Sequence, residues 1–209
     1  MQLVSVNVGA ARPIRTKSGM SGIYKEPVTT PVEVGPLGLD GDAIVDTRNH
    51  GGEDQAVYLF GVPDYDWWAN ELGRDLPPGT FGENLTVTDL ESASCNIGDR
   101  LRSGQVLLEV TSPRIPCATL AARMGEPAFV KRFAKAERFG VYCRVIESGP
   151  VQVGEAVTFE PFQGVTVSAL EVFRAFYAGT WDEAMLRRAL NAPLHRRTRR
   201  EYEGLLRTG

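Results

Sequence analysis

The residue types best suited to chemistry lie in one short segment, Ser112-Pro113-Arg114-Ile115-Pro116-Cys117, directly after the apolar run at 106–110. Proline fixes φ and lacks a backbone N–H, so two prolines exclude this segment from a sheet and hold Cys117 in a stiff loop. Arg114 lies three residues earlier, and a nearby cation lowers a thiol pKa. The resulting thiolate is a nucleophile and a soft metal ligand. The alternative is that Cys117 is a buried structural cysteine.

The remaining cysteines and the two histidines narrow the kinds of site that are available. Cys143 lies in an expected strand and favours plain packing, whereas Cys95 can be structural or functional. Three cysteines without a C-x-x-C spacing make neither a disulfide framework nor a zinc ribbon. With only His50 and His195, far apart in the sequence, a site built from neighbouring histidine ligands is excluded.

Three further segments can bind or orient a ligand. Asn49-His50-Gly51-Gly52 has adjacent glycines whose N–H groups suit an anion, and His50 either donates to a ligand or caps a turn. Phe81-Gly82-Glu83-Asn84 sets polar groups in an apolar frame, where they satisfy the backbone or face a ligand. Lys25 is an isolated cation among apolar residues, and its alternative is an exposed edge-strand lysine.

The elements that must position these residues are mostly short strands. Near residue 164 the sequence pattern changes from short apolar runs between turn residues to helical spacing. The 22 glycines and 13 prolines are scattered, which favours a β-rich body with many turns. Residues 1–164 hold 15 Lys and Arg against 21 Asp and Glu, whereas residues 165–209 hold 8 against 5. Apolar alternation predicts strands at 2–8, 54–60, 105–111, 141–147 and 156–160, and helical spacing predicts helices at 64–72 and 127–137.

Beyond residue 164 the pattern predicts a small C-terminal bundle of three helices. Ser168 and Thr180 each begin a sequence with capping-box spacing, and a third helix follows Pro193. This third helix carries several arginines, which form either a nucleic-acid or partner-docking face or a solvated face. The net charge of −3 favours the solvated face, so no nucleic-acid partner is expected.

Several broad classes are excluded by motifs that are missing. No apolar run reaches the roughly 18 residues of a membrane span, and the first residues alternate like a strand rather than a signal peptide. We therefore expect a cytoplasmic protein with reduced thiols and no membrane partner. The Gly/Asp turn at 38–42 lacks EF-hand spacing, and no P-loop or G-x-G-x-x-G fingerprint is present.

These segments, taken in order, resemble the MOSC family, which is named for the C-terminal domain of molybdenum-cofactor sulfurases. The resemblance is to stand-alone bacterial members that end in three helices, and it extends over nearly the whole chain. Each motif alone is modest, but five in the same order are specific. They are Gly38-Leu39-Asp40-Gly41-Asp42, Asn49-His50-Gly51-Gly52, Phe81-Gly82-Glu83-Asn84-Leu85, Ile97-Gly98-Asp99 and Pro113-Arg114-Ile115-Pro116-Cys117.

The resemblance implies a mainly β, barrel-like α+β domain at 1–164 with the helical bundle at 165–209. It implies the molybdenum cofactor (Mo-molybdopterin), with Cys117 as the protein ligand to molybdenum. It also implies reduction of N-hydroxylated substrates such as purines for detoxification, with electrons from a separate reductase, and a homodimer. Cys117, His50 and Asn84 are then catalytic candidates. The expected cofactor-binding residues are Lys25, Asn49, His50, Gly51, Gly52, Phe81, Asn84, Ser112, Arg114 and Cys117.

Two other functions use the same residues. Cys117 can instead carry a persulfide, as in a sulfur-transfer protein that serves a metal–sulfur centre or cofactor maturation. The arginine-rich tail can instead serve a non-catalytic anion or nucleic-acid binding module. The sequence does not discriminate the reductase from the sulfur carrier, because both need the same cysteine.

Overall fold

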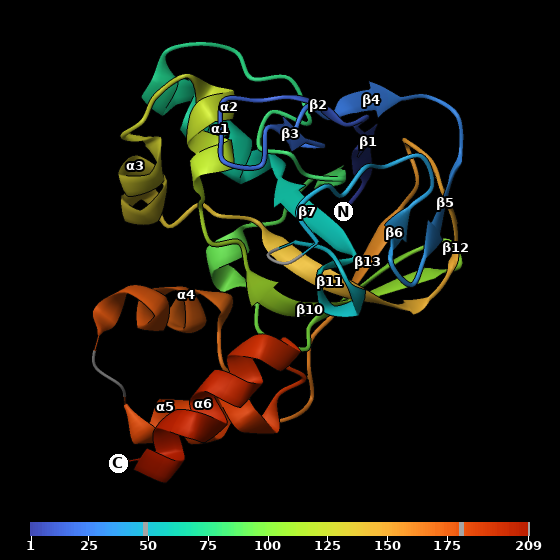
Figure 1. The fold of residues 1–209 in the computed structure, drawn as a ribbon. Helices are drawn as coiled ribbons and strands as arrows, with labels where there is room; N and C mark the ends of the chain where they lie inside the picture. Colours follow the sequence, from blue (N-terminus) through green and yellow to red (C-terminus); the bar gives the residue numbers. More distant parts are fainter. Residues whose placement is uncertain (48–49, 180–181, 209) are drawn as a thin grey trace.

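The computed structural model describes residues 1–47, 50–179 and 182–208 (Figure 1). Within this part of the chain, eight strands form one mixed sheet. They are β1 (Leu3–Val8), β4 (Glu26–Val28), β7 (Val57–Gly61), β8 (Leu85–Val87), β9 (Arg100–Ser103), β10 (Val106–Pro113), β11 (Val141–Glu147) and β13 (Val157–Glu160). Their order in the sheet is β13-β9-β10-β11-β7-β8-β1-β4, and β7 and β8 pair in parallel.

The sheet curls until β1, the first strand in the chain, meets β13, the last strand in the chain, and this contact closes the sheet into a barrel. Gln2 forms an antiparallel bridge with Ala156. The N–H of Leu3 donates to the carbonyl of Glu155 at 2.9 Å, and the N–H of Val157 donates to the carbonyl of Met1 at 3.0 Å. Closure satisfies backbone groups that an open edge would leave unpaired. The expected barrel-like, α+β fold is therefore confirmed.

The smaller strands form hairpins at the side of the barrel. One small sheet contains β5 (Val32–Gly35), β6 (Gly38–Leu39) and β12 (Gly149–Val151), and β2 (Arg12–Pro13) pairs with β3 (Met20–Ser21). Two 3-10 turns complete the body, η1 (Glu53–Gln55) and η2 (Ser92–Ser94).

One group of helices packs against the barrel around a buried tryptophan. The group contains α1 (Val62–Leu72), α2 (Ala118–Met124) and α3 (Phe129–Ala136), which lie together at the upper left of Figure 1. Trp68 of α1 is fully buried, stacks on Phe133 of α3 at 5.5 Å between ring centroids, and lies 5.1 Å from Phe129. These aromatic contacts fix α3 against α1.

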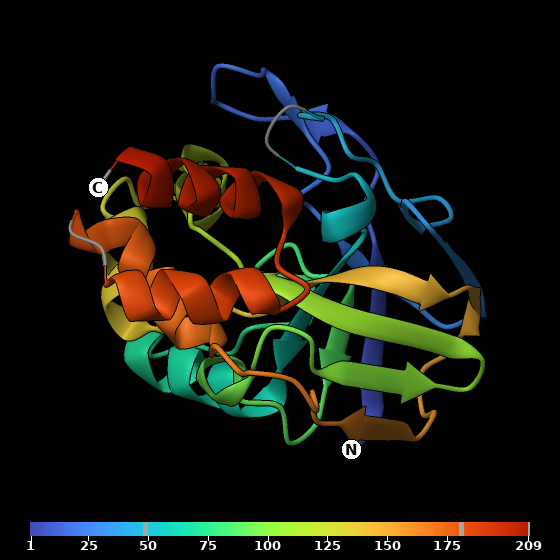
Figure 2. The same cartoon turned by 90° about the horizontal axis from the view of Figure 1, so that it is seen from below.

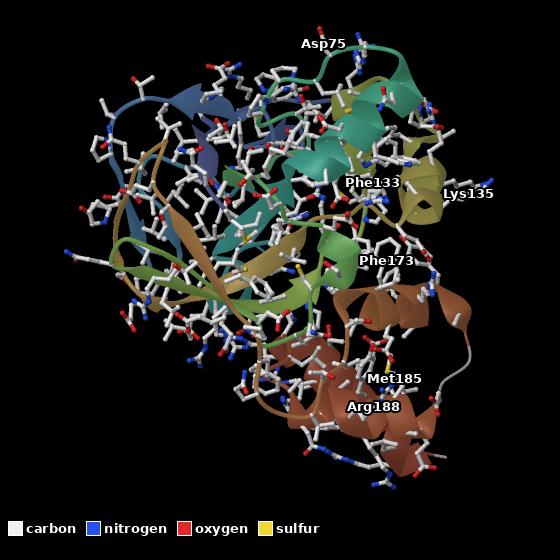
Figure 3. The ribbon with its side chains drawn as sticks, turned by 180° about the vertical axis from the view of Figure 1, so that it is seen from behind. Asp75, Phe133, Lys135, Phe173, Met185 and Arg188 are labelled. Atoms are coloured by element: carbon white, nitrogen blue, oxygen red, sulfur yellow. The ribbon has the colours of Figure 1, made fainter. Side chains whose placement is uncertain are left out.

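The C-terminal helices form a second group, which lies below the barrel in Figure 1 and at the left of Figure 2. They are α4 (Ala169–Ala178), α5 (Glu183–Asn191) and α6 (Arg196–Thr208). The predicted capping box at Ser168 is present, because its side chain accepts the N–H of Glu171 and the Glu171 carboxylate accepts the N–H of Ser168. Phe173 points from α4 toward the body (Figure 3) and stacks on Phe139 at 4.4 Å.

A strand or helix is present at each predicted position within the described residues, but the structure contains further elements that were not predicted, among them β8 and β9 of the main sheet. The strand expected at 54–60 begins as the 3-10 turn η1, and the helix α2 was not predicted. The second capping box was assigned to Thr180, which lies outside the described residues, and the N-cap of α5 is Asp182. The domain boundary at residue 164 stays a prediction. Among the described residues, no helix is long and apolar enough to cross a membrane.

Candidate functional site

Two clefts share a wall at Cys117. The first cleft contains about 660 Å³ of space including its open mouth, and its lining includes Lys25, Asp42, Asn84 and Arg114. The second cleft lies between the loop after β10 and the C-terminal helices. The residues that line both clefts are His50, Gln55, Cys117 and Tyr142.

Cys117 is the N-cap residue of α2, directly after the short loop 114–116 that follows β10. Its Sγ lies 4.0 Å from Nε2 of His50 and 4.0 Å from Nη2 of Arg114. Burial alone would raise the thiol pKa, but the His50 ring, the Arg114 charge and the N–H of Leu120 together lower the pKa of Cys117 to about 6. The thiol is therefore mostly thiolate at neutral pH.

The His50 ring has a carboxylate on its other side. Its Nδ1 lies 3.8 Å from Oδ2 of Asp46, and the ring is about one-third exposed, at 31%. Asp46, His50 and Cys117 thus follow one another in a line of carboxylate, imidazole and thiol. A carboxylate at Nδ1 favours the ring orientation in which Nε2 faces the sulfur.

Arg114 is a buried cation held on three sides. Its Nη1 donates to the hydroxyl of Tyr142 at 2.9 Å, and its guanidinium lies 5.0 Å from the centroid of the Tyr58 ring. Nη2 faces Cys117, while the buried Nε has no hydrogen-bond partner among the described residues. An unpartnered donor in a buried guanidinium is costly, so this Nε is available to a ligand; the buried Nε atoms of Arg123 and Arg144 are likewise without a partner among the described residues.

A second buried cation, Lys25, lines the first cleft. The ammonium of Lys25 donates to both carboxylate oxygens of Asp42. Asp42 also accepts the N–H of Gly9 at 2.9 Å and the side-chain amide of Asn84 at 2.9 Å. Burial lowers the pKa of Lys25, and the Asp42 charge opposes this effect. Asn84 therefore orients the Lys25–Asp42 pair, and its Oδ1 accepts the N–H of Tyr58.

The glycine pair has the backbone that an anion needs. Gly51 and Gly52 have φ values of 75° and 77°, the left-handed region that favours glycine. Neither N–H has an acceptor among the described residues. Gly51 lines the first cleft, and both line a neighbouring polar pocket beside α6. Asn49, the other candidate of this segment, lies outside the described residues.

The remaining predicted residues occupy different places. Ser112 is buried in the wall of the second cleft, and its hydroxyl has no partner among the described residues. Phe81 lines neither cleft, because it is fully buried and stacks on Phe60 at 4.5 Å. Cys95 and Cys143 are both buried, and burial raises the pKa of each thiol, that of Cys95 to about 12.

Sequence reasoning missed residues that reach the site only through the fold. Asp42 was interpreted as part of a turn, although it is the counter-ion of Lys25. Tyr142 lies in the middle of an apolar strand, where no local signal separates it from core residues. His195 is far from His50 in the sequence, yet both line the second cleft. The polar residues at 40–42 next to two glycines were the signal that could have indicated Asp42.

The described residues do not form a metal site on their own. No group of three or more His, Cys, Asp or Glu side chains among them is placed to hold a metal ion. One thiolate with two buried cations instead suits a metal that arrives with most of its ligands inside an anionic organic group. The unpartnered Nε of Arg114 and the free N–H groups of Gly51 and Gly52 add donors for such an anion.

Comparisons with known proteins identify the family. The MOSC domain model matches residues 46–158. The chain is 34% identical over 154 residues to the uncharacterized protein YflK of Bacillus subtilis, covering 73% of this chain and 70% of that protein. It is 36% identical over 142 residues to a protein named Reductase from Gibberella moniliformis, covering 66% of this chain but only 25% of that protein.

A solved structure has the same fold along its whole length. The crystal structure of YiiM from Geobacillus stearothermophilus superposes with a TM-score of 0.80 at 28% sequence identity, covering 97% of each chain. The family model and YflK cover enough of the chain to settle its membership. The chain belongs to the MOSC domain family.

Proposed function

We propose that this protein is a molybdenum-cofactor-dependent reductase of N-hydroxylated compounds, with Cys117 as the protein ligand to molybdenum. The observation that carries the proposal is a thiolate, Cys117, in the wall of a cleft that also holds the buried cations Lys25 and Arg114. A relative that is named a reductase supports the reaction class.

The residues present fit such a cofactor. The Cys117 thiolate is a soft ligand, and Lys25, Arg114 and the N–H groups of Gly51 and Gly52 suit the anionic pterin and its phosphate. When bound, the cofactor supplies the two-electron redox chemistry that protein side chains lack.

The reaction consumes two electrons and two protons. The N–O bond of the N-hydroxyl group breaks, the nitrogen is reduced to the amine or imine, and the oxygen leaves as water. A separate reductase supplies the electrons. Arg114 keeps its proton at any physiological pH, so it orients the leaving oxygen rather than protonating it. His50, which contacts both Cys117 and solvent, delivers a proton to the leaving oxygen. Asn84 positions Lys25 through its hydrogen bond to Asp42.

The test is protein made in a host that synthesises the cofactor. Molybdenum is measured by elemental analysis and pterin by fluorescence. Activity is measured as the reduction of an N-hydroxylated base, with a reduced viologen dye as the electron source. We expect molybdenum to co-purify and Cys117→Ser to lose both metal and activity. Cys95→Ala, which removes a thiol away from both clefts, is the matched control. Absence of molybdenum, or full activity of Cys117→Ser, would contradict the proposal.

A second candidate function rests on the alignment of Asp46, His50 and Cys117. A thiolate beside an imidazole is a nucleophile that can attack the outer sulfur of a donor persulfide; the new S–S bond forms on Cys117 while the donor leaves as its thiolate. A sulfur carrier would show a reducible mass increase of about 32 Da on Cys117 in intact-protein mass spectra. The same increase on Cys117 in protein without molybdenum would favour this function over the reductase.

A further inference from the structure

We infer that an outer groove beside the first cleft is the docking surface of the separate electron donor, and that this donor is a small redox protein with an acidic face. This inference rests on the proposed function and adds the surface at which its electrons enter. The outer groove lies between the hairpin of β2 and β3 (12–21) and the helices α2 and α3. It is lined by Ile14, Arg15, Ala118, Ala121, Ala122 and Val130, among others.

The outer groove and the first cleft lie on the two sides of one thin wall. In the hairpin, residues 13–15 line the groove, whereas Met20 and Ser21 line the first cleft. At the start of α2, Ala118 lines the groove and Cys117 lines the cleft, although their Cα atoms are only about 3.8 Å apart. A protein seated in the groove therefore reaches within about one helix diameter, roughly 10 Å, of the Cys117 sulfur. Electron transfer requires such a short separation.

The floor of the outer groove is apolar and is made of small side chains. Ala118, Ala121 and Ala122 leave the groove side of α2 without any long side chain that would hold a partner away from the helix. Ile14 of the hairpin and Val130 of α3 continue the apolar floor on either side. Figure 1 shows the hairpin beside α2 in the upper part of the molecule. An apolar centre inside a polar rim is the usual arrangement of a protein docking surface.

The rim of the outer groove is basic. Arg15 lines the groove and Lys17 lies in the turn of the same hairpin, and both are exposed without an ion pair among the described residues. Lys131, which follows Val130 on α3, is also exposed and has no ion pair within the described part of the chain. Among the described residues that line the groove, the one acidic side chain is Glu126, and Arg132 neutralises it at 2.9 Å.

This charge sets the kind of partner that the outer groove fits. Residues 12–21 and 118–136 together hold seven Lys and Arg against one Glu, whereas the whole chain holds 23 Lys and Arg against 26 Asp and Glu. A positive rim on an otherwise acidic protein attracts an acidic partner and orients it during the encounter. Exposed charges add little binding energy, so the complex is short-lived, which suits a carrier that must leave once it is oxidised. Two such encounters, each delivering one electron, supply the two electrons of one turnover.

The experiment compares protein donors with a dye on the cofactor-loaded protein, with an N-hydroxylated base as substrate. The donors are two acidic carriers, a [2Fe–2S] ferredoxin and a flavodoxin, kept reduced by NADPH and a ferredoxin reductase. Arg15→Glu and Lys131→Glu test the rim, and Arg200→Glu, at an exposed arginine of α6, is the matched control. We expect at least one carrier to drive turnover, and its kcat/KM to fall about three- to tenfold in each rim variant at low salt. The difference should shrink in 0.5 M salt, which screens exposed charges.

The dye provides the internal control for the same variants. A reduced viologen is a small cation that needs no docking surface, and removing positive charge from the rim does not repel it. Its rate should therefore stay at or above the wild-type value in both rim variants, as should the molybdenum content. Arg200→Glu should keep the wild-type values with the dye and with both carriers.

Binding tests the outer groove without any turnover. By calorimetry at low salt, oxidised ferredoxin should bind the wild type and Arg200→Glu equally, and both rim variants more weakly. If this pattern is found but neither dye nor carrier drives reduction, the groove assignment stands and the proposed reaction is wrong. If the dye drives turnover but neither carrier does, or if the rim variants keep the carrier's kcat/KM, the groove assignment is overturned. Tighter binding of a DNA duplex than of ferredoxin, lost in the same variants, would assign the surface to nucleic acid and overturn it as well.

Discussion

The ionisation of Cys117 gives a direct test of the geometry of the site. The sulfur lies 4.0 Å from the His50 ring and 4.0 Å from the Arg114 guanidinium, and these groups outweigh the effect of burial. We predict that His50→Ala raises the pKa of Cys117 in cofactor-free protein, because it removes a partner that stabilises the thiolate. Arg114 and the N–H of Leu120 remain, so the pKa should not return fully to that of a free cysteine.

The structure sets the size of the effect. The pKa of Cys117 is about 6, against an ordinary value of 9.0, which corresponds to about 4 kcal/mol in favour of the thiolate. At pH 7 about 90% of the thiol is then ionised, compared with about 1% for an ordinary cysteine. If His50 supplies about a third of the free energy that favours the thiolate, removing it moves the pKa of Cys117 to about 7. The ionised fraction of Cys117 at pH 7 then falls to about half.

The assay is the pH dependence of alkylation by iodoacetamide, followed by intact-protein mass spectrometry. Cys95 and Cys143 are buried, so the first alkylation of the native protein reports Cys117. Gln55→Ala is the control, because Gln55 lines the same clefts but does not titrate. A wild-type midpoint between pH 8 and 9, or an unchanged midpoint in His50→Ala, would refute the reasoning.

Three further outcomes follow from buried groups. Asp42→Ala leaves Lys25 charged and unpaired in the wall of the first cleft, so the free energy of unfolding in urea should fall by about 3–5 kcal/mol. Adding Lys25→Met should recover part of this loss, and an unchanged free energy of unfolding in Asp42→Ala would mean that the pair is not buried. The lowered thiol pKa of Cys117 stabilises the fold fully above the unfolded thiol pKa, and this stability is lost as pH falls through about 6. Thermal unfolding of cofactor-free protein should therefore show stability rising between about pH 6 and 9 relative to Cys117→Ser, and parallel curves would contradict this. Trp68→Ala should cost about 3–5 kcal/mol in urea unfolding, since the ring is fully buried, and a cost below about 1 kcal/mol would contradict that packing.

The elements whose signals are local were predictable from the sequence. The alternation at 141–147 and the capping box at Ser168 depend on neighbouring residues, and both are present in the structure. The loop predicted before Cys117 is shorter than expected. Pro116 lies in it, but Ser112 and Pro113 belong to β10 and pair with Tyr142 and Val141, so the exclusion of these two residues from the sheet was wrong. The helix α2 was missed because it is short, Ala118–Met124, and its N-cap is Cys117, which is not a capping residue of the usual kind.

The site depends on contacts that no local pattern records. Asp42 meets Lys25 only because β1 and β4 bring the turn at 40–42 beside the strand that follows residue 25. His195 meets the loop after β10 only because a hydrogen bond to Thr111 joins residues 84 positions apart. Phe81, in contrast, resembles a ligand contact in the sequence motif but packs in the core, because Phe60 and Trp68 lie on either side of it.

The carboxylate of Asp54 has a mechanical consequence. It lies in η1, four residues after His50, and it holds both the first turn of α6 and Arg144 of β11. The loop that faces the thiolate and the helix that forms the far wall therefore share one anchor. A change at Asp54 therefore acts on the start of α6 and on Arg144 of β11 together, and Glu53 of the same turn adds a second, exposed ion pair to Arg196 at 2.8 Å.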